Sequence, residues 1–180
     1  MGEAVHVVSS RASDNPWILG NLAISRAAIE IVEQAGRDAY ARDEEACGYL
    51  QGPSSEPLLC DVAVELENLA NKYHTVDPEA HPRTGHDYFK INSKKFERAL
   101  ALGVDSQRPV KVFFHSHLDC GAYFSAEDAA SMTLGDGGEP TYDLAYLVTA
   151  VDQGKVTAHK LFIWDSAAKR FAEAPFTEVA

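Results

Sequence analysis

The sequence VKVFFHSHLDCGAYFSAED, residues 110–128, is the most informative stretch of this chain. Its opening run, Val110–Phe114, is apolar and rich in β-branched and aromatic residues, which is typical of a buried strand. Side chains alternate along a strand, so His115 and His117 should project from one face while Ser116 points away. The stretch therefore predicts two imidazoles side by side at the end of a buried strand.

A serine and a carboxylate follow the histidines at short spacing. Zinc in catalytic sites commonly takes three protein ligands and keeps a fourth position for water, and two histidines with a carboxylate are an accepted set. His115, His117 and Asp128 supply that set, while Ser125 has the place of a helix N-cap with Asp128 in the first turn. Either half alone is explained by core packing or by capping, but capping leaves the two histidines unexplained. The combination predicts one Zn2+ per chain.

Composition and charge narrow the class of protein. The chain has 180 residues, of which 46% are hydrophobic, and this is enough for one compact domain. Its formal net charge of -11, without a cluster of lysines or arginines, disfavours nucleic acid or an anionic membrane as a partner. We see no apolar run long enough for a membrane span, no signal peptide and no CxxC pair. We therefore expect a cytoplasmic protein.

Helices and strands are predicted in a mixed order without regular alternation, which disfavours a doubly wound parallel sheet. Residues 1–21 are predicted to form a leader with a short strand at Ala4–Val8 and a polar loop. A domain over residues 22–176 follows, with a loop at 68–86 that is long enough to be an insertion. Its expected elements are helices from Ser25 to Ala41, from Ser93 to a closing Gly103 and from Ser125 onward, a hairpin of strands Cys47–Gln51 and Pro57–Leu66, and later strands at 143–151, 155–164 and 170–176.

An acidic pair upstream of the histidines introduces a candidate base. Water activated at zinc needs a group that takes its proton, and a carboxylate suits this role. Glu44 and Glu45 lie just before the strand that starts at Cys47, and Gly48 in that strand allows close approach of another backbone. Taken alone, the pair is more typical of a solvated helix end, and local pattern does not distinguish the two acids.

Together these residues resemble the JAMM (MPN+) motif of the Mov34/MPN/PAD-1 zinc metalloproteases. The resemblance follows the order Glu45-x-Cys47-Gly48, His115-x-His117, then Ser125 and Asp128, and it covers roughly residues 22–165. It implies an α/β MPN fold, a single domain with a curved mixed β-sheet flanked by helices. It also implies that Glu45 is the general acid/base, that Ser125 stabilises the oxyanion, and that the zinc ligands are the three named above.

The resemblance implies a function as well as a fold. The family cleaves peptide or isopeptide bonds after the C-terminal Gly-Gly of ubiquitin-like proteins, and a small chain without an appended ubiquitin-binding part is most similar to its bacterial and archaeal stand-alone members. We therefore expect a zinc-dependent metalloprotease or isopeptidase that acts on a ubiquitin-like or sulfur-carrier protein. An E1-like activating enzyme encoded nearby is a further expected partner. Two departures are Leu118, where many members have proline, and the long 68–86 loop.

Two other functions stay open. A metallo-β-lactamase-type hydrolase has an HxHxDH pattern that begins in the same way at His115, but here Cys120 replaces its third histidine. A non-catalytic MPN scaffold would bind partners without metal. It would have no need of the five polar motif residues, which are Glu45, His115, His117, Ser125 and Asp128. We expect Cys120 to be a packed thiol, while His74, His81 and His86 leave a second metal site open.

Overall fold

The computed structural model describes residues 15–135 and 138–180, and the predicted strand Ala4–Val8 lies outside these residues. Six strands form the main sheet, in the order β4-β2-β5-β6-β7-β8. Their bounds are Cys47–Gln51 for β2, Val62–Leu66 for β4, Val110–Leu118 for β5, Ala145–Asp152 for β6, Lys155–Asp165 for β7 and Arg170–Ala174 for β8. The pair β5 and β6 is parallel and the other neighbours are antiparallel, so the predicted mixed sheet is confirmed.

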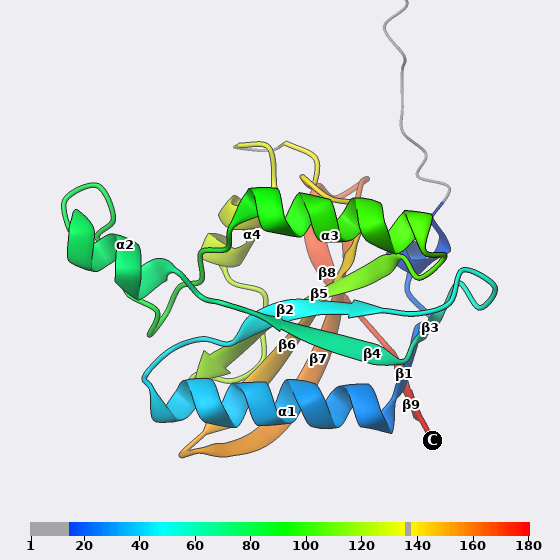
Figure 1. The fold of residues 1–180 in the computed structure, drawn as a ribbon, viewed down its shortest axis with the longest axis horizontal. Coiled ribbons are helices and arrows are strands. Elements are labelled where there is room, and N and C mark those ends of the chain that lie inside the picture. The colour runs from blue at the N-terminus through cyan, green and yellow to red at the C-terminus, as the bar shows by residue number, and fades with distance from the viewer. Residues whose placement is uncertain (1–14, 136–137) are drawn as a thin grey trace, which may run out of the picture.

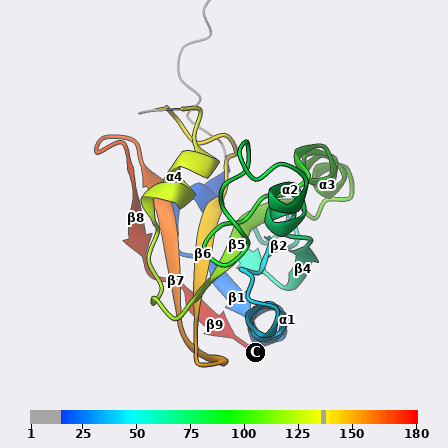
Figure 2. The same cartoon turned by 90° about the vertical axis from the view of Figure 1, so that its left-hand side faces the viewer.

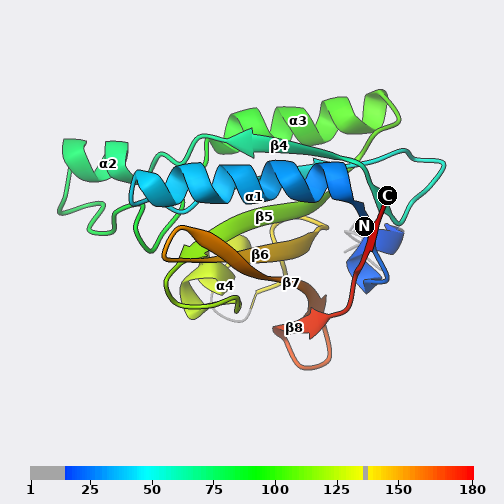
Figure 3. The same cartoon turned by 90° about the horizontal axis from the view of Figure 1, so that it is seen from below.

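Helices cover both faces of this sheet. Helix α1 (Arg26–Ala41) lies along one face, whereas α3 (Ser93–Asp105) and α4 (Ala126–Met132) pack against the other (Figures 1 and 2). Seen from below, α1 crosses in front of β5 (Figure 3). The β5 side chains divide as alternation requires: Val112 and Phe114 join the core cluster of α1, while Phe113 joins the cluster of α3.

The helix starts follow local capping chemistry. Ser25 caps α1 as predicted, because its hydroxyl oxygen accepts the N–H of Ala28 at 3.1 Å. The predicted cap of α3 is wrong by one residue: Asn92 accepts the N–H of Lys95, and Ser93 is the first helical residue. The predicted stop at Gly103 is also wrong, since α3 continues to Asp105. A Cβ at residue 103 would lie 2.8 Å from the backbone oxygen of Arg108, so this glycine permits close approach rather than ending the helix.

A second, three-stranded sheet was not predicted. It has the order β3-β1-β9, where β1 is Ala23–Ser25, β3 is Leu59–Cys60 and β9 is Thr177–Val179. The predicted strand Pro57–Leu66 is therefore wrong as one element, because its first half pairs with β1 and only its second half pairs antiparallel with β2. The short β1 is parallel to both of its neighbours.

The predicted loop at 68–86 contains a short helix, α2 (Ala70–Val76), which projects beyond the end of the sheet at the left of Figure 1. A 3-10 helix, η1 (Pro16–Leu19), precedes β1. Among the helices of the described residues, none has both the length and the apolarity that crossing a bilayer requires.

Candidate metal centre

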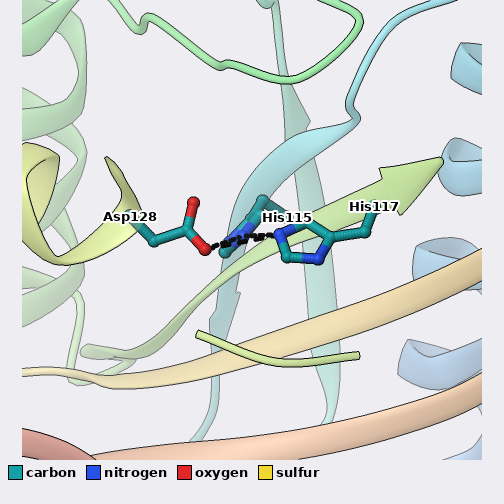
Figure 4. A group of neighbouring side chains, drawn as sticks. All are labelled: His115, His117 and Asp128. Atoms are coloured by element: carbon teal, nitrogen blue, oxygen red, sulfur yellow. Dashed lines mark hydrogen bonds and ion pairs between the residues drawn. The ribbon is translucent and has the colours of Figure 1, made fainter. Parts of the chain in front are cut away.

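Three side chains converge at the C-terminal end of β5. The imidazoles of His115 and His117 leave the same face of the strand, as predicted, and meet the carboxylate of Asp128 from the first turn of α4 (Figure 4). The Nε2 atoms of the two histidines are 3.1 Å apart, and Asp128 Oδ2 lies 3.2 Å from that of His115 and 3.3 Å from that of His117. All three residues are buried, and no other group of this kind occurs in residues 15–135 or 138–180.

The spacing of these atoms fits a tetrahedral metal. Ligands held about 2.0–2.1 Å from zinc at tetrahedral angles lie roughly 3.3 Å from one another. Proton accounting leads to the same conclusion. Nδ1 of His117 lies 3.0 Å from the backbone oxygen of Gly121, to which it can only donate, so Nε2 of the neutral ring carries a lone pair. This lone pair faces a carboxylate oxygen, and the group therefore fits a cation.

A reciprocal cap fixes the orientation of Asp128. Its backbone N–H donates to the Ser125 hydroxyl oxygen at 3.0 Å, and its Oδ2 accepts the N–H of Ser125 at 2.8 Å, which completes the predicted capping box. Burial alone would raise the pKa of the Asp128 carboxyl, but the neighbouring histidines and the hydrogen bond from the N–H of Ser125 hold this pKa below its usual range. Asp128 is thus held as a carboxylate.

Aromatic rings hold the histidines in place. The ring of His115 packs between Phe89 and Phe124, with centroid separations of 4.9 and 6.1 Å. The ring of Tyr123 lies 4.8 Å from that of His117 at the exposed rim of the site. Sequence reasoning missed Phe89, Gly121 and Tyr123, because only the folded chain brings them to the histidines. Nδ1 of His115 is buried without a hydrogen-bond partner among the described residues, so this ring is oriented by packing on one side and by its Nε2 contact with Asp128 on the other.

Glu45 joins the same site from the segment before β2. Its Oε1 lies 4.0 Å from Nε2 of His117, and its Oε2 is buried with no partner in the described part of the chain. Burial, reinforced by the charges of Asp128 and Asp87, raises the pKa of Glu45 to about 9. Glu44 points elsewhere, to Asn71 at 3.0 Å, so the structure distinguishes the two acids that local pattern left equivalent.

Ser116, between the two histidines, ties this segment to β5. Its hydroxyl accepts the N–H of Ala46 at 2.8 Å, and its own N–H donates to the Ala46 oxygen at 2.9 Å. Ser116 points to the face of α1, where its Cβ is 3.7 Å from the position of a Cβ built on Gly36. One strand thus carries two metal-ligand candidates on one face and an anchor for the candidate base on the other.

A model of the family described as prokaryotic homologs of the JAB domain matches residues 25–163. The chain belongs to this family. A protein of Desulfitobacterium hafniense solved in solution shares 20% identity over 88% of this chain and 92% of its own, with a TM-score of 0.62. A JAB1/MPN domain protein of Archaeoglobus fulgidus has 14% identity over 89% of this chain and 99% of its own, with a TM-score of 0.53.

A solution structure of a Salinibacter ruber protein is similar to the same degree, with 22% identity over 88% of this chain and 92% of its own and a TM-score of 0.53. A search of curated proteins found no match. At these identities the solved structures speak for the fold alone, and they confirm that this JAB-family chain has the predicted α/β MPN fold.

Other polar residues of the motif region lie outside the site. Cys120 is exposed, so the prediction of a packed thiol is wrong. Asp119 accepts hydrogen bonds from the Tyr40 hydroxyl and the Gln153 N–H, which turns the third element of the metallo-β-lactamase pattern away from the histidines. The three loop histidines do not converge on a second metal site in the described residues: His74 bonds the oxygen of His81, and His86 bonds Asp43.

Proposed function

We propose that this JAB-family chain is a zinc-dependent peptidase of the cytoplasm that hydrolyses the peptide or isopeptide bond after the C-terminal Gly-Gly of a ubiquitin-like or sulfur-carrier protein. One observation carries the proposal. A buried carboxylate oxygen of Glu45 without a partner lies beside a complete set of three buried ligand atoms. Burying such a carboxylate is costly, and the arrangement is typical of a general base at a metal site.

The chemistry that zinc supplies at such a site is polarisation of a carbonyl and activation of water. Glu45 in its ionised form accepts a proton from the attacking water and returns it to the leaving amine. Glu45 can be ionised when a metal is bound, although burial raises its pKa in the metal-free chain. A cation at His115, His117 and Asp128 favours the carboxylate and opposes the effect of burial.

We propose that Ser125 acts on the carbonyl oxygen of the substrate. Its hydroxyl oxygen accepts the N–H of Asp128 at 3.0 Å, which leaves the hydroxyl proton available. We assign this proton to a hydrogen bond with the oxyanion, where a single donor commonly contributes about 100-fold or more to the rate.

The burial of the site favours a substrate that enters as a narrow, extended chain. The residues Glu45, His115, His117 and Asp128 are between 0% and 4% exposed. A chain that reaches them in an extended form passes most easily where it has no side chains, which favours two consecutive glycines. The projecting α2 exposes Tyr73 and Val76, and we propose that the 68–86 insertion contacts the folded body of the ubiquitin-like protein. An E1-like activating enzyme encoded nearby fits the same proposal as a functional partner.

The test uses purified protein with one equivalent of zinc and ubiquitin-like domains whose Gly-Gly end is fused to a reporter peptide or joined to a lysine. Glu45→Gln is expected to retain zinc and to lose activity by about 100-fold to 10,000-fold, the usual contribution of a positioned base. Glu65→Gln is the matched control, because it removes an exposed carboxylate from β4 at the same end of the sheet.

Three results would contradict the proposal in different ways. Full activity of Glu45→Gln would reject Glu45 as the base. A wild-type chain that binds no zinc and hydrolyses nothing would favour the scaffold. Cleavage of unrelated peptides at rates equal to those for Gly-Gly fusions would reject the substrate class while leaving the peptidase chemistry in place.

A further inference from the structure

Asn68 uses all its hydrogen-bonding capacity next to the catalytic glutamate. Its Nδ2 donates to the backbone oxygens of Glu45 and Tyr88 at 3.0 and 2.9 Å. Its Oδ1 accepts the backbone N–H groups of Ala70 and Lys90 at 3.0 and 3.1 Å. Two donors facing carbonyls and one oxygen facing N–H groups also settle the orientation of this amide, because the flipped amide would lose all four bonds.

These four bonds join three separate parts of the chain. Ala70 is the first residue of α2, and Tyr88 and Lys90 belong to the return of the same segment toward α3. Leu69 donates to the oxygen of Lys90 at 2.7 Å and closes the base of the loop. Asn68 therefore fastens both ends of segment 69–90 to the backbone of Glu45.

The same segment also holds the other side of the Glu45 peptide. The N–H of Glu45 donates to the oxygen of Gly85 at 2.6 Å, and the N–H of Gly85 donates to Asn71 Oδ1 at 2.7 Å. Gly85 is buried, and a Cβ on it would lie 3.3 Å from Asn71 Nδ2 and 3.4 Å from Asn68 Nδ2. The backbone of Glu45 is thus bound at its oxygen by Asn68 and at its N–H by segment 69–90, and the next residue, Ala46, is bound by Ser116 of β5.

We infer that Asn68 is a positioning residue, which links segment 69–90 to Glu45. Through this link, a substrate docked on the segment affects the position of the Glu45 carboxylate. The functional half of this inference rests on the proposed function. Asn68 itself does not touch the reacting atoms. It acts by fixing the Glu45 peptide, whose side chain has to be placed within a fraction of an ångström of the attacking water to work efficiently.

The decisive variant is Asn68→Asp, compared with Asn92→Asp in the full-length, zinc-loaded chain. The aspartate keeps the shape and the acceptor oxygen at residue 68, but it loses both donors and sets an anionic oxygen against the oxygens of Glu45 and Tyr88. Asn92→Asp is the same chemical change at a side chain that makes no donor bond to residues 15–135 or 138–180, because among them Asn92 uses only its Oδ1, to cap α3. Any general effect of an added charge appears in both variants.

Hydrogen exchange followed by mass spectrometry tests the link without requiring activity. Asn68→Asp is expected to speed exchange in two places at once, at the Glu45 amide and across segment 69–90, while zinc content stays at one per chain. Asn92→Asp is expected to leave both unchanged. Unchanged exchange at the Glu45 amide in Asn68→Asp overturns the inference, whatever the activity of the variant.

Steady-state kinetics then test positioning. We expect kcat to fall about 100-fold in Asn68→Asp with little change in KM, as for a misplaced catalytic group. Adding Asn68→Asp to Glu45→Gln is expected to cost almost nothing more, since the two act through one carboxylate. Faster exchange with an unchanged kcat would reduce Asn68 to a purely structural role and overturn the inference. If the wild-type chain hydrolyses no Gly-Gly substrate, the proposed function fails, and exchange alone decides the link.

Discussion

The two ends of strand β5 bury charge in opposite ways. Near its start, the side chain of Lys111 is fully buried, and its ammonium donates to the backbone oxygens of Pro53, Glu56 and Leu59 at 3.0, 2.9 and 2.7 Å. Near its end, two imidazoles and a carboxylate direct acceptor atoms at one another. Within residues 15–135 and 138–180, no lysine or arginine forms an ion pair with Asp128 or Glu45.

This difference separates a structural charge from a functional one. The buried ammonium of Lys111 has hydrogen-bond acceptors from the chain itself, so its donors are satisfied. It holds the 53–59 turn against the sheet. Acceptors assembled without a cation cost folding free energy, and such a cost is typical of a site organised for binding or catalysis. Because both ends lie on one strand, their behaviour can be compared by single substitutions in the same protein.

Loss of a zinc ligand gives the largest expected effect. Zinc at 1,000 times its Kd is expected to raise the free energy of unfolding of the wild-type chain by about 4 kcal/mol. Asp128→Asn is expected to abolish this increase and the hydrolytic activity with it, as measured by urea unfolding with and without zinc. Asp119→Asn is the control, because Asp119 faces Tyr40 and Gln153 rather than the histidines. Loss of the zinc response in Asp119→Asn instead would mean that the ligand set is wrong.

Removal of the cation at the other end of β5 ranks second. Lys111→Met fills similar space but removes the ammonium donor from three backbone oxygens, which we expect to lower the free energy of unfolding by about 3 kcal/mol. Zinc binding is expected to persist, since the ligands lie at the far end of the strand. Lys95→Met, at an exposed position of α3, provides the comparison in urea unfolding. Equal stability of the two variants would show that solvent satisfies these oxygens.

Glu45 gives the smallest and most pH-dependent effect. In the zinc-free chain its pKa of about 9 lies above the ordinary value of 4.5, so between these pH values the unfolded chain releases the proton while the folded chain keeps it. Stability is therefore lost as pH rises through this window, and Glu45→Gln escapes the loss. We expect the variant to be more stable by about 2 kcal/mol at pH 6 and equal to the wild type below pH about 4. Parallel stability curves from pH 4 to 8 would contradict this sign.

Local chemistry explains which elements could be predicted from the sequence. The alternation around His115, the cap at Ser25 and the capping box at Ser125 all depend on residues within a few positions of one another. The predicted mixed sheet and the caps of α1 and α4 are accordingly confirmed, and the three candidate ligands His115, His117 and Asp128 lie together in the structure.

Long-range pairing explains what the sequence analysis missed. The three residues of β1 form a strand because they meet Leu59–Cys60 and Thr177–Val179, and no local pattern indicates such partners. The same pairing divides the predicted strand Pro57–Leu66 between two sheets. The predicted stop at Gly103 is wrong because this glycine serves the close approach of the chain at Arg108, just beyond the end of the helix.

The candidate site shows the same division. The ligand set could be proposed from spacing alone, whereas Glu45 could be separated from Glu44 only by family resemblance and then by the structure. Asn68 had a local signal, because Asn after a strand often bonds a backbone N–H two residues on, as it does here with Ala70. Its bond to Glu45 spans 23 residues and could not be predicted from that signal.

The two tryptophans of the chain lie in different surroundings. Trp17 is buried, donates to the Asp143 oxygen, and has the Lys111 ammonium 5.9 Å from its ring centroid. Trp164 on β7 is half-buried and lines a hollow together with Ser125 and Ala126 at the start of α4. Intrinsic fluorescence thus carries one signal from beside the Lys111 ammonium and another from the hollow at the start of α4, and replacing either indole with phenylalanine isolates the other.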